Sequence, residues 1–153
     1  MQKADPLKPI LVAIVCVLGC MLVESRGLPE GCDLPSFVLP ISAPISEPGF
    51  RILIVEESSQ RRDLPASQAA IFSSSELADY AKAKCVAVDG VPEFRVFDPD
   101  VVLTNESDVW KQALAIERKS LPWLIVSDGR RGFSGPLPLT LEDTMAIVKR
   151  YGG

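Results

Sequence analysis

Short apolar runs and segments with helical periodicity alternate along the C-terminal two thirds of the chain. Residues 51–56 form a β-branched apolar run, which is typical of a strand buried on both faces of a sheet. Residues 94–97 and 123–126 predict two more strands. An Asp-Gly pair at positions 128–129 then favours a tight turn into residues 132–134, which predicts a hairpin.

Three segments have the three-to-four spacing of apolar residues that predicts amphipathic helices. The first opens with a capping box formed by Ser73 and Glu76, and the last opens with another, formed by Thr140 and Asp143. The middle helix is expected over residues 105–119, with an asparagine as its N-cap.

The segments between these elements have weaker patterns. Residues 57–63 read as a polar loop, and Pro65 can occupy the first turn of a helix. Residues 85–88 are a short strand candidate, followed by a turn at residues 90–92. From residue 51 onward the order is strand, helix, strand, helix, strand, strand, helix. This order predicts an α/β fold with a small mixed sheet flanked by helices on both faces.

The N-terminal region has a different pattern. Lys3 and Lys8 precede an uncharged apolar run, residues 10–23. At about 1.5 Å per residue this run makes roughly 21 Å of helix, which is short of the ~30 Å hydrocarbon core of a bilayer. A basic start, a short apolar run and small residues at its exit predict a secretory signal in residues 1–25. Two alternatives stay open: lipidation at Cys20, in a lipobox-like sequence, and retention of the segment as a membrane anchor.

Residues 26–49 carry prolines at short intervals among glycines and serines. Proline removes backbone donors and blocks helix formation, so this region predicts a semi-extended linker. The globular domain is then expected over residues 50–153. The expected localisation is outside the cytoplasm, either secreted or held at the cell envelope through the N-terminal segment.

Composition excludes several kinds of chemistry. The chain contains no histidine, which removes Ser-His-Asp and Cys-His catalysis and histidine-bearing zinc sites. The net charge is −4 with acids and bases interspersed, so no nucleic-acid partner is expected. The densest acidic stretch, residues 98–108, has the spacing of no calcium-binding loop. The chain is therefore expected to hold no metal and no cofactor.

Two of the four cysteines, Cys32 and Cys85, lie after the N-terminal apolar segment. In an oxidising compartment, an even number of cysteines favours a disulfide between them. The alternative is an unpaired Cys32 and a small buried thiol at Cys85.

Residues 121–153 resemble the C-terminal part of a thioredoxin-like domain. Pro122 stands where that family has a cis-proline, directly before the strand at residues 123–126. The family's cysteine pair follows the first core strand, where this chain has residues 57–63 and no cysteine. The resemblance therefore implies a degenerate member of the thioredoxin-like superfamily that lacks the Cys-x-x-Cys motif.

In active members of that family, the cis-proline loop pairs with the substrate backbone, which implies a groove that can bind a peptide without cysteines. The candidate binding residues come from the proline loop and the polar loop opposite it: Pro122, Trp123, Ser58, Ser59, Arg61 and Arg62. The expected function is a protein- or peptide-binding module with no redox activity and no catalytic residue.

Two other classes of function stay open. The first is an enzyme, either a thiol redox protein that uses Cys85 alone or a hydrolase that uses Glu56 or Glu57. The second is a structural protein of the cell envelope, which predicts a large exposed apolar patch and no discrete groove.

Overall fold

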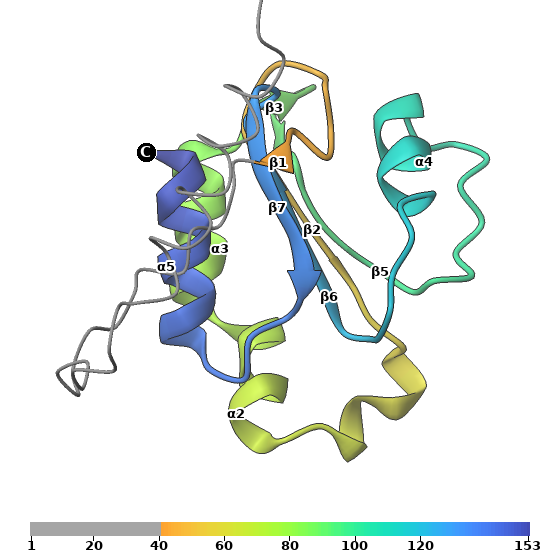
Figure 1. Ribbon diagram of the computed structural model, residues 1–153, viewed down its shortest axis with the longest axis vertical. Helices are drawn as coiled ribbons and strands as arrows, with labels where there is room; N and C mark the ends of the chain where they lie inside the picture. Colours follow the sequence, from red (N-terminus) through yellow and green to blue (C-terminus); the bar gives the residue numbers. More distant parts are fainter. Residues whose placement is uncertain (1–40) are drawn as a thin grey trace, which may run out of the picture. The chain divides into compact units, whose positions relative to one another are not determined.

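The structure, a computed structural model, describes residues 41–153, which form a mixed α/β domain (Figure 1). Four strands make the sheet in the order β7-β6-β2-β5, and the two-residue strand β1 pairs with β7 at one edge. β2 is parallel to β5, and the other neighbouring strands are antiparallel. The strands are β1 Ile41–Ser42, β2 Arg51–Val55, β5 Phe94–Phe97, β6 Trp123–Ser127 and β7 Arg131–Pro136. The α/β class and the mixed sheet expected from the sequence are confirmed.

Helices cover both faces of this sheet. α3 and α5 lie side by side on one face, and α4 lies on the other (Figure 1). A separate small hairpin pairs β3 with β4. These elements are η1 Ser58–Asp63, α2 Ala66–Ala69, η2 Ala70–Ser73, α3 Ser75–Lys84, β3 Ala87–Val88, β4 Val91–Pro92, α4 Asp108–Leu114 and α5 Leu141–Gly152.

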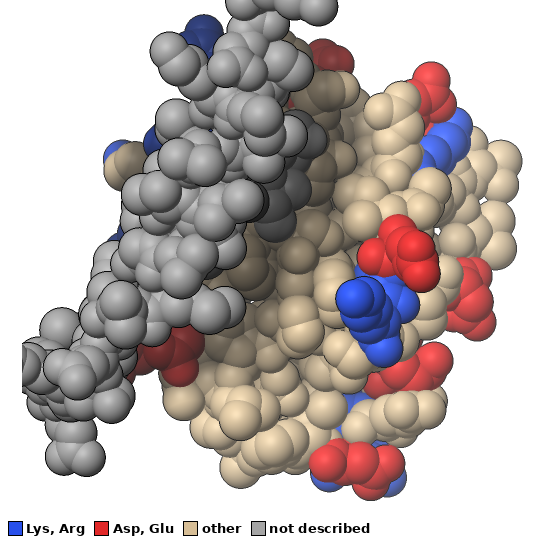
Figure 2. Space-filling model, in the orientation of Figure 1, with Lys and Arg blue, Asp and Glu red and all other residues tan. Residues whose placement is uncertain are grey.

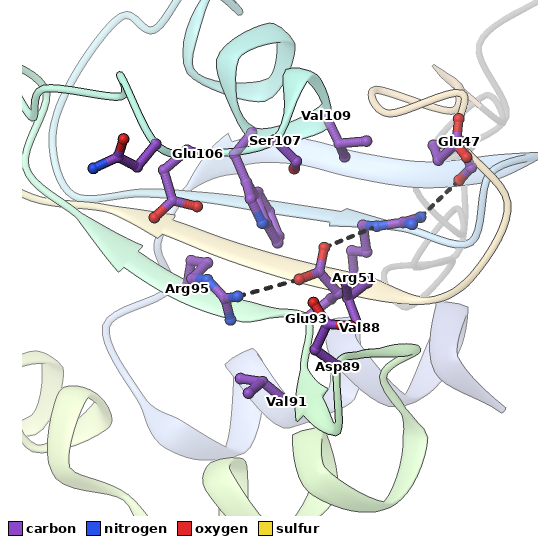
Figure 3. Close-up of a pocket in the computed structure, with 12 residues that line it drawn as sticks. Glu47, Arg51, Val88, Asp89, Val91, Glu93, Arg95, Glu106, Ser107 and Val109 are labelled. Carbon is purple, nitrogen blue, oxygen red and sulfur yellow. Dashed lines mark hydrogen bonds and ion pairs between the residues drawn. The ribbon is translucent and has the colours of Figure 1, made fainter.

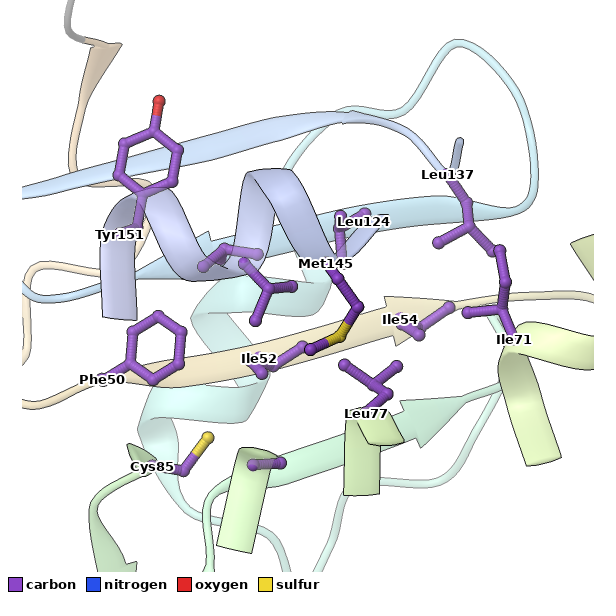
Figure 4. Packing of buried hydrophobic residues seen from close by; sticks show 13 residues of the cluster. Phe50, Ile52, Ile54, Ile71, Leu77, Cys85, Leu124, Leu137, Met145 and Tyr151 are labelled. Carbon is purple, nitrogen blue, oxygen red and sulfur yellow. The ribbon is translucent and has the colours of Figure 1, made fainter. Parts of the chain in front are cut away.

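Side chains along β2 alternate between two hydrophobic cores. Ile52 and Ile54 pack in the cluster formed with α3 and α5 (Figure 4), whereas Leu53 and Val55 pack with α4 around Trp110. Every residue of β2 is buried, and a fully buried aliphatic side chain contributes about 1.5–3 kcal/mol. A strand covered on both faces favours apolar side chains at successive positions, which explains the four consecutive apolar residues that follow Arg51.

The capping predictions are right for α5 and wrong by one residue for α3. Thr140 is the N-cap of α5, and its Oγ1 accepts a hydrogen bond from the Asp143 N–H at 3.2 Å. For α3 the N-cap is Ser74, whose Oγ accepts from the Leu77 N–H at 3.2 Å, and not Ser73. Consecutive serines offer the same capping chemistry, so the sequence cannot distinguish them.

α4 is shorter than predicted at both ends. Its N-cap is Ser107 and not Asn105. Beyond Leu114 the chain leaves the helix, and the Arg118 guanidinium donates to the carbonyl oxygens of Leu114 at 2.7 Å and Ile116 at 2.9 Å. These local bonds satisfy carbonyls that a longer helix would have satisfied within itself, so a nearby side chain replaces the last turn of the predicted helix.

The hairpin near residue 90 also differs from the prediction. Val88 pairs with Val91, so the turn consists of Asp89 and Gly90, and Pro92 lies in a strand. Asp89 has φ of 51° and Gly90 has φ of 77°. Two central residues with positive φ are typical of a two-residue type I′ turn, for which Asp-Gly is a favoured sequence.

Part of the segment assigned to the linker contacts the domain. Strand β1 pairs with β7, and Ile45 is buried in the core on the α4 side. Gly129, at φ of 87°, lies so close to this segment that an added Cβ would be 2.8 Å from the Glu47 carbonyl oxygen. The turn therefore needs glycine, and the folded unit includes residues N-terminal to position 50.

Several predictions lie outside the described residues: the signal or anchor in residues 1–25, lipidation at Cys20, the first part of the linker, and the partner cysteine Cys32. Among the helices of residues 41–153, none combines the length and the apolar character that a membrane span requires.

Candidate functional site

The C-terminal end of β2 brings together two loops that are far apart in the sequence. Leu121 and Pro122 line a small pocket together with Glu56, Glu57, Gln60 and Leu64. The peptide bond between Leu121 and Pro122 is cis. The carbonyl oxygen of Pro122 accepts a hydrogen bond from the Leu137 N–H at 2.9 Å. The proline loop and the polar loop therefore lie next to each other.

A larger hollow of about 410 Å³ adjoins this pocket, and it is lined by Gln60, Pro99, Arg118, Lys119, Ser120 and Leu121. Gln60 and Leu121 line both spaces, and we call the two neighbouring spaces together the proline groove. Leu121 is 40 % exposed. Within residues 41–153, no hydrogen bond involves its backbone N–H or C=O. The groove thus offers a backbone donor and a backbone acceptor to an extended chain.

An ion pair lies beneath the groove. Glu56 is buried, and the Arg61 guanidinium donates to both of its carboxylate oxygens, with an Nε–Oε2 distance of 2.9 Å. The hydrogen bond to Glu56 raises the pKa of Arg61. The Arg61 guanidinium also lies 5.0 Å from the ring centroid of Phe72, and the side chain is 45 % exposed. Glu56 is therefore paired, while one side of the guanidinium faces solvent.

The two serines of the polar loop form hydrogen bonds near its N-terminal end. The Ser58 N–H donates to the Asp98 carboxylate at 2.7 Å, and hydrogen bonding from Ser58 lowers the pKa of Asp98. The Ser59 hydroxyl donates to the Glu57 carboxylate at 2.8 Å. Both serines stabilise the loop, and neither lines the pocket beside Pro122.

The last two candidates differ in exposure. Trp123 is only 7 % exposed, and its indole N–H donates to the Ser134 hydroxyl at 2.9 Å, so it packs within the sheet. Arg62 is exposed, and residues 41–153 supply no ion-pair partner for it. Of the six candidate residues, Pro122 lines the groove directly, and Arg61 holds the groove residue Glu56.

The opposite end of β2 carries a second, larger pocket that no sequence pattern predicts (Figure 3). Its volume is about 590 Å³. The β3–β4 hairpin contributes Val88, Asp89 and Val91, and the start of α4 contributes Ser107 and Val109 (Figure 3). We call this space the charged pocket, because Arg51, Glu93 and Arg95 lie across it.

The charged pocket is organised by a buried ion-pair network. Glu93, only 4 % exposed, accepts from Arg51 Nε at 3.4 Å and from Arg95 Nη2 at 3.2 Å. Arg51, also buried, donates from Nη1 to the carbonyl oxygens of Glu47 at 2.9 Å and Pro48 at 2.8 Å. These bonds tie the segment before β2 to the sheet, so the network has a structural role.

The sequence indicates only part of this ion-pair network. An arginine directly before an apolar strand, and a Glu-Phe-Arg sequence at positions 93–95, place charges where burial is expected. Residues two apart on a strand point to the same face, which predicts that Glu93 and Arg95 lie together. The pairing of Arg51 with Glu93, 42 residues away, depends on the parallel neighbours β2 and β5.

Cys85 follows α3 and is buried, with 8 % of its surface exposed. Burial raises the pKa of its thiol to about 12, and the nearby Glu93 carboxylate adds to this rise. Because the thiolate is the nucleophile in thiol chemistry, Cys85 is a weak candidate for redox catalysis. Its proposed disulfide partner, Cys32, lies outside the described residues.

Acidic and basic side chains lie close together on the face seen in Figure 2, and they do not separate into areas of one sign. Within residues 41–153, no group of three or more Cys, Asp or Glu side chains is arranged to hold a metal ion. Comparisons with family models, with curated proteins and with solved structures found no match.

Proposed function

We propose that residues 41–153 form a thioredoxin-like module that binds an extended peptide segment of a partner protein in the proline groove, without redox chemistry. The observation that carries the proposal is the exposed Leu121 beside Pro122, whose backbone N–H and C=O have no hydrogen-bond partner within the described residues. An extended peptide can satisfy both groups by adding strand-like pairing at this edge.

Topology supports the thioredoxin-like part of the proposal. The resemblance implies a central parallel pair of strands, followed by an antiparallel hairpin and a closing helix. The sheet order β7-β6-β2-β5, with β2 parallel to β5, has this arrangement. α3 and α5 on one face and α4 on the other agree with it as well. Pro122 lies directly before β6, as the resemblance requires.

The residues that replace the cysteine pair support the absence of redox chemistry. After β2 the chain continues through Glu56 into η1, which contains two serines and no cysteine. The free thiol within the described part of the chain, Cys85, is buried, and it lines none of the pockets that form the proline groove. A groove with this lining can bind a peptide, but it holds no nucleophilic thiolate.

Export is the second part of the proposal, and its support comes from the sequence alone. The basic start and the uncharged run at residues 10–23 favour secretion or attachment to a membrane. The proline-rich residues that follow would then separate the binding module from the membrane.

The test is peptide selection with the full-length protein as bait. A library of random linear peptides is displayed on phage and selected on the wild type, on Pro122→Ala and on the matched control Pro92→Ala. Pro92 lies in β4 and lines neither part of the groove. We expect recurrent peptides from the wild type and from Pro92→Ala, and about tenfold weaker binding of those peptides to Pro122→Ala, because the groove wall has changed.

Either of two results would contradict the proposal. One is the absence of any recurrent peptide. The other is equal binding of the selected peptides to the wild type and to Pro122→Ala.

A further inference from the structure

We infer that the proline groove selects peptides that carry an acidic side chain next to the residue paired with Leu121. This inference rests on the proposed function, and it names the class of partner: an extended segment with an aspartate or glutamate at a fixed position.

The larger hollow of the groove has only basic charges in its lining. Its charged residues are Arg118 and Lys119, and its other lining residues are uncharged: Gln60, Pro99, Ser120 and Leu121. Within residues 41–153, no carboxylate forms an ion pair with either cation. The adjoining small pocket contains Glu56, which is paired with Arg61, and Glu57, whose carboxylate accepts from the Ser59 hydroxyl and forms no ion pair within residues 41–153. The excess of basic charge is therefore confined to the larger hollow.

The two cations differ in what they can offer a ligand. Arg118 is half-buried, and one nitrogen of its guanidinium, Nη1, is already used at the carbonyl oxygens of Leu114 and Ile116. Arg118 is therefore a fixed positive charge in the wall. Lys119 is exposed and forms no ion pair within residues 41–153. Its ammonium can therefore pair with a ligand carboxylate without breaking an ion pair within the protein.

The position of Lys119 sets where the acidic residue must lie. Lys119 precedes Leu121 by two residues. Lys119 and Leu121 line the same hollow, and a lysine side chain is long and flexible. A peptide residue paired with Leu121 would therefore bring its neighbours to this hollow, where a carboxylate can pair with Lys119 beside the fixed charge of Arg118.

The experiment extends the peptide selection to Lys119→Glu, with Lys82→Glu as the matched control. Lys82 is an exposed lysine on α3, which packs on the other face of the sheet from α4. We expect wild-type peptides to share an Asp or Glu at one position. The Lys119→Glu protein should bind those peptides about threefold to tenfold more weakly, whereas Lys82→Glu should bind them as the wild type does.

A synthetic pair of peptides completes the test. One is a peptide selected by the wild type, and the other has its shared acidic residue changed to the amide, Glu→Gln or Asp→Asn. Equal affinity of the two peptides, combined with weaker binding to Pro122→Ala, would overturn the acidic preference and leave the binding module intact. If no peptide is selected at all, the proposed function and this inference both fail.

Discussion

The two ends of strand β2 each carry an arginine–glutamate pair, and the pairs differ in exposure. At the start of β2, Arg51 and Glu93 have side chains that are 6 % and 5 % exposed. At the other end, Glu56 is 2 % exposed, but its partner Arg61 is 45 % exposed. The first pair is closed within the protein, and the second has one side open to solvent.

The two arginines also differ in the hydrogen bonds that they form. Arg51 donates from Nη1 to three consecutive backbone carbonyls and from Nε to Glu93, so it is bound to the backbone as well as to a carboxylate. Arg61 donates only to Glu56 within the described part of the chain. The larger pocket therefore lies where the arginine is also bound to the backbone, and the proline groove lies where the arginine binds the carboxylate alone. Pocket size would favour the charged pocket for a ligand, whereas the unpaired backbone groups of Leu121 favour the proline groove as the proposed peptide site.

The largest expected effect concerns Cys85, which lies near the closed pair. At about pH 8, a thiol with a pKa of about 12 is ionised in roughly one molecule in ten thousand. Alkylation of Cys85 in the native protein should therefore be about a thousandfold slower than alkylation of an exposed cysteine. Timed iodoacetamide labelling with peptide mass spectrometry measures this rate. Labelling at the rate of an exposed thiol would revive the one-cysteine redox alternative.

Next in size is the loss of the closed pair. Glu93→Ala leaves Arg51 buried without its carboxylate, and breaking a buried pair in this way costs about 3–5 kcal/mol. Urea denaturation should show this decrease in the free energy of unfolding. Glu106→Ala is the matched control, because Glu106 lines the same pocket without an ion pair in the described residues; it should change stability by about 0.5 kcal/mol or less. Equal losses in the two variants would contradict the structural role of the network.

The open pair should matter less. Arg61→Ala leaves the Glu56 carboxylate unpaired, which costs about 1–3 kcal/mol, and the loss of a half-exposed guanidinium lets water reach the carboxylate. Arg62→Ala, at the exposed neighbouring position, should cost about 0.5 kcal/mol or less. Denaturation of both variants beside Glu93→Ala gives the comparison. A loss for Arg61→Ala as large as that for Glu93→Ala would mean that the two ends do not differ.

The smallest effect is a dependence on pH at the open end. Hydrogen bonding from Ser58 lowers the folded-state pKa of Asp98, so its contribution to stability is present above the unfolded pKa of about 3.9 and is lost as pH falls below it. Thermal unfolding of the wild type and Asp98→Asn should differ at neutral pH and converge below about pH 4. Asp100→Asn is the control for the loss of one negative charge, because it removes a neighbouring carboxylate and keeps the bond between Ser58 and Asp98. A constant difference between the wild type and Asp98→Asn would contradict this assignment.

The fold could be predicted from the sequence to a large extent, because the strongest signals are local. β2, β5 and β6 are apolar runs, and Thr140 caps α5 as its spacing with Asp143 indicates. The errors occur where the sequence allows more than one local structure. The chain leaves the helix after Leu114, and Arg118 binds the Leu114 carbonyl oxygen in place of a further helical turn.

The candidate site could be predicted only in part. The resemblance predicts candidate binding residues at Pro122 and in the loop after β2, and the structure places these two loops side by side. Trp123 was also named, but strand alternation buries it in the core on the α4 side. The resemblance indicates neither Leu121 nor Lys119. Unpaired backbone groups and unpaired charges can be recognised only when the positions of the neighbouring loops are known.

We expect the proline groove, and not the charged pocket, to receive the partner. Amide chemical-shift mapping of the full-length protein, titrated with a peptide that it has selected, distinguishes the two sites. Binding in the groove should shift the amides of Gln60, Lys119 and Leu121, and leave those of Val88, Asp89 and Arg95 unchanged. Shifts at Val88, Asp89 and Arg95, with the groove amides unchanged, would contradict it.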